Sequence, residues 1–130
     1  MATIRKELTL TAAPEAVWDA FRDYQNVHER VAKGFVVASK PEGEGARLIT
    51  FANGMITRED LISMDDAGRR LAYTAAGGGV LKHHNGVFEV KPEGAGTKVV
   101  WTLDVLPHEA APVISEMMEA GCAAMRRTLG

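Results

Sequence analysis

The middle of the chain is a run of six short β-prone segments, and this run limits the possible folds more than any other feature. Turn-forming residues, mainly glycine, proline, asparagine and aspartate, separate the segments. The segments cover residues 35–40, 46–52, 55–64, 70–76, 84–91 and 97–106. Strands that follow one another on such short connections predict an antiparallel meander. Within it, Asn53-Gly54 predicts a two-residue hairpin turn of type I′.

One further strand and two short helices are predicted before this run. Apolar and polar residues alternate over residues 3–11, as in a half-buried strand. Pro14 stands where a helix can begin without losing a hydrogen bond, and apolar residues at helical spacing follow it. Asn26, with Glu29 three residues later, indicates the start of a second short helix over residues 27–32.

A longer amphipathic helix is predicted after Pro112. It spans about 17 residues, or roughly 25 Å at 1.5 Å per residue. The side chains that we expect to face the sheet are Met117, Met118, Gly121 and Met125, with Cys122 nearby. The helix is long enough to cross a seven-stranded sheet.

This order of elements predicts an α+β fold built as one domain, residues 1–130. A twisted antiparallel sheet of seven strands can curl around the long helix, while the two short helices close one end. A chain of 130 residues has the size of one compact domain, and no linker divides it.

The net charge and the cysteine content limit which binding partners and which cellular compartment we expect. Fifteen Lys and Arg against 17 Asp and Glu give a net charge of −2, so we expect no nucleic-acid partner. Cys122 is the single cysteine and cannot form an internal disulfide, as is typical of a reducing compartment. The sequence has no signal-peptide pattern and no apolar run near the roughly 20 residues that cross a bilayer. We therefore expect a cytoplasmic protein without a membrane span.

The space between sheet and helix can be interpreted in two ways, as a filled core or as a cavity. Gly121 costs about 1 kcal/mol relative to alanine inside a helix, so it indicates either a close approach by a bulky side chain or a need for space. Methionines can fill a core or adapt to a ligand. Aromatic residues make up only 6% of the chain, which favours a cavity because bulky filling side chains are scarce.

Several short motifs along the chain resemble those of one family. In chain order they are residues 12–18, 43–47, Glu59 with Leu61, residues 69–73 and residues 94–101. With these motifs the chain resembles a START-like (SRPBCC) domain of the polyketide cyclase/dehydrase and lipid-transport type. The resemblance implies the helix-grip architecture shared with the major birch pollen allergen and the plant abscisic acid receptors.

The resemblance also implies an internal cavity for an apolar or aromatic small molecule. Some relatives cyclise or dehydrate polyketides, whereas others only bind and carry. Residues 24–31 lack the Trp-Pro element common in relatives, so the identity of the ligand does not transfer. Ligand binding is the leading hypothesis. The alternatives are a cyclase or dehydratase and a co-chaperone-like interaction module, and a homodimer is an open possibility.

Strand alternation and the inward helix face together predict the residues that contact the ligand. They are Tyr73, His84, Phe88, Trp101, Leu103, Met117, Met118, Gly121 and Met125. A buried indole N–H needs a partner, which for Trp101 we expect to be a ligand, a water or a carboxylate. The Tyr73 hydroxyl could hydrogen-bond a ligand carbonyl.

Arg47 and Glu59 are the candidate catalytic residues. They lie six residues before and after the midpoint of the predicted hairpin, which brings them together across the ladder. If they face the cavity, Arg47 keeps the Glu59 carboxylate charged, and Glu59 serves as a general base. The other interpretation is a surface salt bridge worth at most about 1 kcal/mol.

No metal or cofactor is expected. His83 and His84 are adjacent in a strand, so their side chains point to opposite faces and cannot bind one ion. Gly77-Gly78-Gly79 is not followed by a helix and therefore does not fit a phosphate-binding loop. We expect it to be a loop near the cavity mouth.

Overall fold

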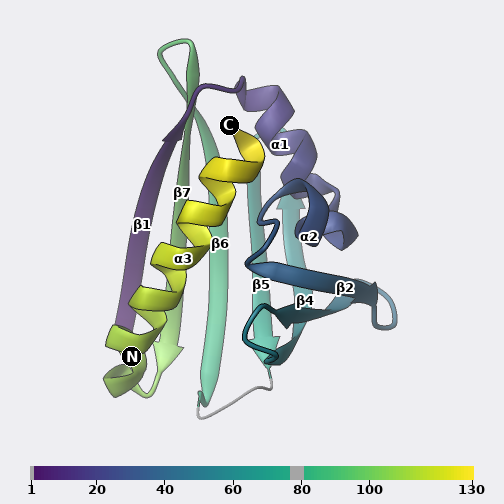
Figure 1. The fold of residues 1–130 in the computed structure, drawn as a ribbon, viewed down its shortest axis with the longest axis vertical. Helices are drawn as coiled ribbons and strands as arrows, with labels where there is room; N and C mark the ends of the chain where they lie inside the picture. The colour runs from purple at the N-terminus through teal and green to yellow at the C-terminus, as the bar shows by residue number, and fades with distance from the viewer. Residues whose placement is uncertain (1, 77–80) are drawn as a thin grey trace.

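The computed structural model describes residues 2–76 and 81–130, and it contains seven strands, two short helices and a long C-terminal helix in those residues (Figure 1). The first half of the chain forms β1 (Ala2–Leu10), α1 (Pro14–Arg22), the 3-10 turn η1 (Tyr24–Asn26), α2 (Val27–Arg30), β2 (Val36–Pro41), β3 (Ala46–Phe51) and β4 (Ile56–Asp65). The second half forms β5 (Arg70–Ala76), β6 (His83–Glu93), β7 (Gly96–Leu106), the 3-10 turn η2 (His108–Ala110) and α3 (Ala111–Leu129). Gly77-Gly78-Gly79 lies outside the described residues.

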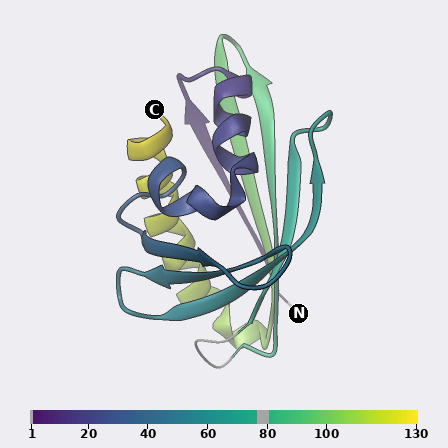
Figure 2. The same cartoon turned by 90° about the vertical axis from the view of Figure 1, so that its right-hand side faces the viewer.

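All seven strands form one antiparallel sheet in the order β1-β7-β6-β5-β4-β3-β2. Consecutive strands from β2 to β7 are neighbours, and β1 pairs with β7 to complete the sheet. Register shifts interrupt the pairing of β4 between Leu61 and Ser63 and of β2 between Val36 and Ala38. Such bulges bend a strand and increase its twist. As a result β2, β3 and β4 curl round toward the side on which the helices lie (Figure 2).

The helices cover one face of this curved sheet. α3 runs across β1 and β7, while α1 and α2 sit at the other end of the same face (Figure 1). Leu103 and Val105 of β7 and Met118, Ala124 and Met125 of α3 are almost fully buried between the layers. The α+β helix-grip fold predicted from the sequence is therefore confirmed, including the inward face of the last strand.

Two local predictions about the helices and turns are corrected. α2 ends at Arg30, earlier than expected. Asn26 occupies its N-cap position, but the Asn26 side chain makes no capping hydrogen bond, and its amide N–H donates to Asp23 at 2.9 Å. The β3–β4 connection is a three-residue loop rather than a type I′ turn. Phe51 and Met55 close it, and only Gly54 has a positive φ, of 90°.

The loop length sets the pairing of β3 with β4. With three residues in the loop, Arg47 pairs with Glu59. A two-residue turn at Asn53-Gly54 would shift the register by one residue and pair Arg47 with Asp60. A shift of one residue reverses the face of every side chain in a strand. The extra loop residue therefore decides which carboxylate lies opposite Arg47.

In the part of the chain that the structure describes, no helix is both long and apolar enough to span a bilayer.

Candidate functional site

A cavity of about 640 Å³ lies between the curved sheet and the long helix. Side chains from α1, α2, the strands β2–β7 and α3 line it, and most of them are apolar. Pockets that bind small molecules typically have volumes of about 300–1,000 Å³ and apolar walls with a few polar groups. The interior is therefore hollow, and the cavity is large enough for a small molecule.

Aromatic side chains are concentrated around this cavity. Six of the eight aromatic residues line it, namely Phe21, Phe35, Phe51, Tyr73, Phe88 and Trp101. Phe88 stacks on Trp101 with ring centroids 5.0 Å apart, and the Phe21 ring packs against Phe88 at a tilt, with centroids 4.7 Å apart. Because bulky rings hold their positions by packing on one another, they form a wall and leave the space beside it open.

Gly121 lets the long helix approach this aromatic wall. A Cβ atom at this position would lie 2.9 Å from the Trp101 ring and 3.2 Å from the Phe35 ring. The glycine also lines the cavity. Of the two interpretations of Gly121, the close approach of a bulky side chain is confirmed, and it occurs at the edge of the open space.

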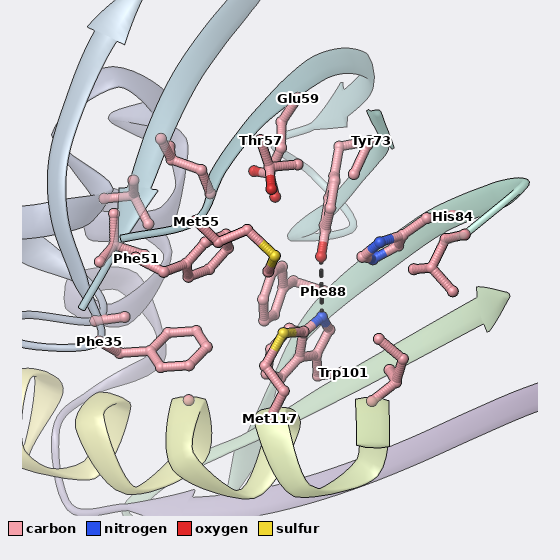
Figure 3. Close-up of a pocket in the computed structure, with 18 of the residues that line it drawn as sticks. Phe35, Phe51, Met55, Thr57, Glu59, Tyr73, His84, Phe88, Trp101 and Met117 are labelled. Atoms are coloured by element: carbon pink, nitrogen blue, oxygen red, sulfur yellow. Dashed lines mark hydrogen bonds between the residues drawn. The ribbon is translucent and has the colours of Figure 1, made fainter. Parts of the chain in front are cut away.

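The Trp101 indole has a partner that the sequence analysis did not anticipate. Its N–H donates to the Tyr73 hydroxyl oxygen at 3.2 Å, so neither a ligand, a water nor a carboxylate is needed (Figure 3). Gly86 pairs with Tyr73 on the neighbouring strand, and a Cβ there would lie 2.5 Å from the Tyr73 ring. Burial raises the pKa of the Tyr73 hydroxyl, which therefore stays protonated.

Arg47 and Glu59 form a buried ion pair that faces the cavity. The Nε and one terminal nitrogen of Arg47 donate to Oε1 of Glu59 at 3.0 and 2.6 Å, and both side chains are less than 10% exposed. The other terminal nitrogen donates to the carbonyl oxygen of Tyr24. The Tyr24 ring stacks on the guanidinium, with Cζ 3.7 Å from the ring centroid. The pairing predicted across the hairpin is confirmed, and the surface interpretation is wrong.

His84 projects into the cavity from β6, whereas His83 is exposed and contacts Asn85 on the other face. Nε2 of His84 is buried and has no hydrogen-bond partner among the described residues. Burial lowers the pKa of His84, the nearby His83 lowers it further, and Glu59 opposes the shift. The imidazole is thus held neutral near pH 7.

The described residues contain no group of three or more His, Cys, Asp or Glu side chains arranged to hold a metal ion. Cys122 is buried, and burial raises the pKa of its thiol.

Most of the residues predicted to contact a ligand line the cavity: Tyr73, His84, Phe88, Trp101, Met117, Gly121 and Met125. Two do not. Leu103 and Met118 are fully buried in the core where α3 covers the sheet, so their placement at the cavity is corrected.

Several other lining residues were not predicted from the sequence. Met55 and Thr57 share the strand face of Glu59 and would have followed from its orientation. Phe35 precedes a strand, and no periodic pattern marks it.

Comparison with known proteins gives one family and a group of structures with the same fold. The family described as polyketide cyclase / dehydrase and lipid transport matches residues 1–130. No curated protein matches the sequence. XoxI of Bacillus cereus is 19% identical over 98% of this chain and 94% of its own, with a TM-score of 0.86.

Two further solved structures are similar. A protein of Thermobifida fusca is 25% identical over 99% of this chain and 91% of its own, with a TM-score of 0.76. Ara h 8.0201 is 14% identical over 97% of this chain and 95% of its own, with a TM-score of 0.74. At such low sequence identities, these similarities show a shared fold.

The surroundings of His84 predict a titration that NMR can follow. The folded pKa of His84 should lie below the usual histidine value of about 6.5, because burial disfavours the charged imidazolium. Between the two values the unfolded chain holds a proton that the folded chain lacks, so stability falls as the pH drops through this window. His84→Gln should remove the loss of stability at low pH that His84 causes. His108→Gln, at an exposed site, should leave that loss unchanged. A His84 pKa at or above 6.5 would contradict the account.

Removing one partner of the buried pair should destabilise the protein strongly. Arg47→Met leaves the Glu59 carboxylate buried without its partner and should cost about 3–5 kcal/mol in urea unfolding. The double variant Arg47→Met/Glu59→Leu should regain most of that loss, since no uncompensated charge remains. Arg58→Ala, which breaks the exposed pair with Asp60, is the matched control and should cost at most about 1 kcal/mol. Equal losses for Arg47→Met and Arg58→Ala would show that the pair is not buried.

Proposed function

The chain belongs to the polyketide cyclase / dehydrase and lipid transport family, and on this basis we propose that it binds a hydrophobic or aromatic small molecule inside the cavity. The ligand lies between the aromatic wall of the sheet and the cavity-facing side of α3. No covalent chemistry is needed for this role.

The observation that carries the proposal is the cavity of about 640 Å³ in a chain of only 130 residues. Protein interiors are normally packed as densely as organic crystals, and empty space forfeits dispersion contacts. A hollow of this size therefore costs stability unless a guest occupies it. Its walls offer aromatic rings and methionine side chains, which suit a planar apolar guest.

Some of the lining residues are exposed, and they indicate where a ligand would enter. They lie in the β3–β4 loop, at the end of β5 and around the start of α3: Asn53, Ala76, Glu109 and Val113. Val113 is 69% exposed although it is apolar. This exposed apolar side chain offers a hydrophobic molecule a first contact at the mouth of the cavity.

Filling the cavity should weaken binding without unfolding the protein. The probe is N-phenyl-1-naphthylamine, an uncharged dye whose fluorescence rises in apolar surroundings. Ala75→Phe places a ring in the cavity and should raise the dye's Kd about tenfold, because accommodating both rings requires overpacking. Ala72→Phe puts the same ring on the opposite face of β5 and is the matched control. Equal Kd values for the two variants, or no binding by the parent protein, would refute the proposal.

A second candidate function is proton transfer during cyclisation or dehydration of a polyketide-like substrate. The observation that favours it is the orientation of Glu59. Its Oε1 accepts both hydrogen bonds from Arg47, while its Oε2 accepts none from the described residues. That free oxygen could remove a proton from carbon next to a ligand carbonyl, and the Tyr73 hydroxyl could donate to the enolate oxygen that develops.

Proton exchange on a simple ketone tests this candidate. In deuterated buffer the parent protein should accelerate exchange of the α-protons of 2-tetralone, followed by NMR. Glu59→Gln should bring the rate down to that of the buffer, because an amide cannot act as a general base. Asp60→Asn removes a carboxylate on the other face of β4 and should leave the rate unchanged. A parent rate equal to that of the buffer would rule out this chemistry.

A further inference from the structure

The polar groups of the cavity are gathered on one wall. Thr57 and Glu59 of β4, Tyr73 of β5 and His84 of β6 point into the space from adjacent strands (Figure 3). The other side of the cavity is apolar and is formed by Phe35, Phe51, Met55 and Met117 among others (Figure 3). A guest that fills this space therefore has one end among hydrogen-bonding groups and the rest among apolar side chains.

Three atoms on the polar wall have unused hydrogen-bonding capacity toward the described residues. Oε2 of Glu59 can accept a hydrogen bond. The Tyr73 oxygen already accepts from Trp101, but its own proton has no acceptor. Nε2 of His84 is buried and unpartnered. Of these three, Nε2 of His84 is the buried atom that has no hydrogen-bond partner among the described residues. Because buried polar atoms are normally satisfied, it indicates that a polar group of a guest belongs on this wall.

Arg47 is the one Lys or Arg among the described lining residues, and its positive charge is already paired with the Glu59 carboxylate. Each of the three guanidinium nitrogens of Arg47 already donates a hydrogen bond, two nitrogens to Glu59 and one to the Tyr24 carbonyl. The Tyr24 ring covers one face of the same guanidinium. Glu109, at the exposed rim, is the other charged lining residue in the described ranges, and it is acidic. A carboxylate guest would therefore meet Glu59 without a free positive charge to offset the repulsion.

We propose that the cavity selects uncharged molecules that carry a hydroxyl group at one end, and that it discriminates against carboxylate anions such as fatty acids. The hydroxyl donates to Oε2 of Glu59, on the same polar wall as the Tyr73 hydroxyl. This selectivity rests on the proposed binding function and specifies the chemistry of its ligand. It favours a hydroxylated aromatic compound over a free fatty acid.

Three probes of one shape test the selectivity: naphthalene, 2-naphthol and 2-naphthoate. Their Kd values are measured by equilibrium dialysis at pH 7, where 2-naphthol is uncharged and 2-naphthoate is an anion. 2-Naphthol should bind about tenfold more tightly than naphthalene, since a hydrogen bond to a buried charged group is worth at least that factor. 2-Naphthoate should bind more weakly than naphthalene.

Two variants show whether Glu59 sets the preference. Glu59→Gln removes the carboxylate and leaves the Arg47 charge without its partner, so 2-naphthoate should then bind at least as tightly as naphthalene, while the advantage of 2-naphthol should fall. Asp60→Asn removes a neighbouring charge outside the cavity and should change none of the ratios. The naphthalene Kd serves as the internal measure of an intact cavity in each variant.

The possible results separate this inference from the function on which it rests. If none of the three probes binds, the proposed binding function fails, and the selectivity fails with it. If naphthalene binds but 2-naphthoate binds as tightly as 2-naphthol, the binding function stands and the selectivity is overturned. Ratios that stay the same in Glu59→Gln would remove Glu59 from the account.

Discussion

The mismatch between one helix and a strongly curved sheet of seven strands is the constraint on which the cavity depends. α3 has 19 residues and packs most closely on β1, at one edge of the sheet. There Met118, Cys122 and Ala124 leave no space. The strands β3 and β4 curl toward the helix without reaching it, so the side chains between them enclose a volume that neither layer fills. The short helices α1 and α2 close the far end.

The contacts around Arg47 allow the protein to bury a charged pair beside the cavity without a large loss of stability. Arg47 is held by Glu59, by the Tyr24 carbonyl and by the Tyr24 ring, so its charge is compensated on every side that the structure describes. A buried pair of this kind contributes little net stability, because desolvation offsets the attraction between the charges. Among the described lining residues, the pair leaves one carboxylate oxygen of Glu59 without a hydrogen bond and no Lys or Arg without a carboxylate partner. The pair thus makes the cavity chemically asymmetric.

The sequence determined the fold well because each element carried a local signal. Strand alternation, the helix-starting Pro14 and the regular turns gave nearly all element positions. The spacing of Arg47 and Glu59 about the hairpin anticipated their pairing, although the predicted two-residue turn would itself have paired Arg47 with Asp60. The face of β4 could not be predicted, because its apolar residues occupy both faces, and Ile56 and Ile62 are more than 50% exposed. Alternation also could not separate Leu103, which lies under α3, from Trp101, which borders the cavity. That distinction depends on where the helix crosses the sheet, and no local pattern encodes the crossing point.

A crystal of the protein soaked in bromobenzene tests most directly whether the interior is hollow and accepts an apolar guest. The account predicts an anomalous bromine peak inside the cavity, between the stacked Phe88 and Trp101 rings and the facing side of α3. It would be contradicted by a structure in which no peak appears and Met55 and Met117 meet across the space with the Phe51 ring, leaving no volume for a guest.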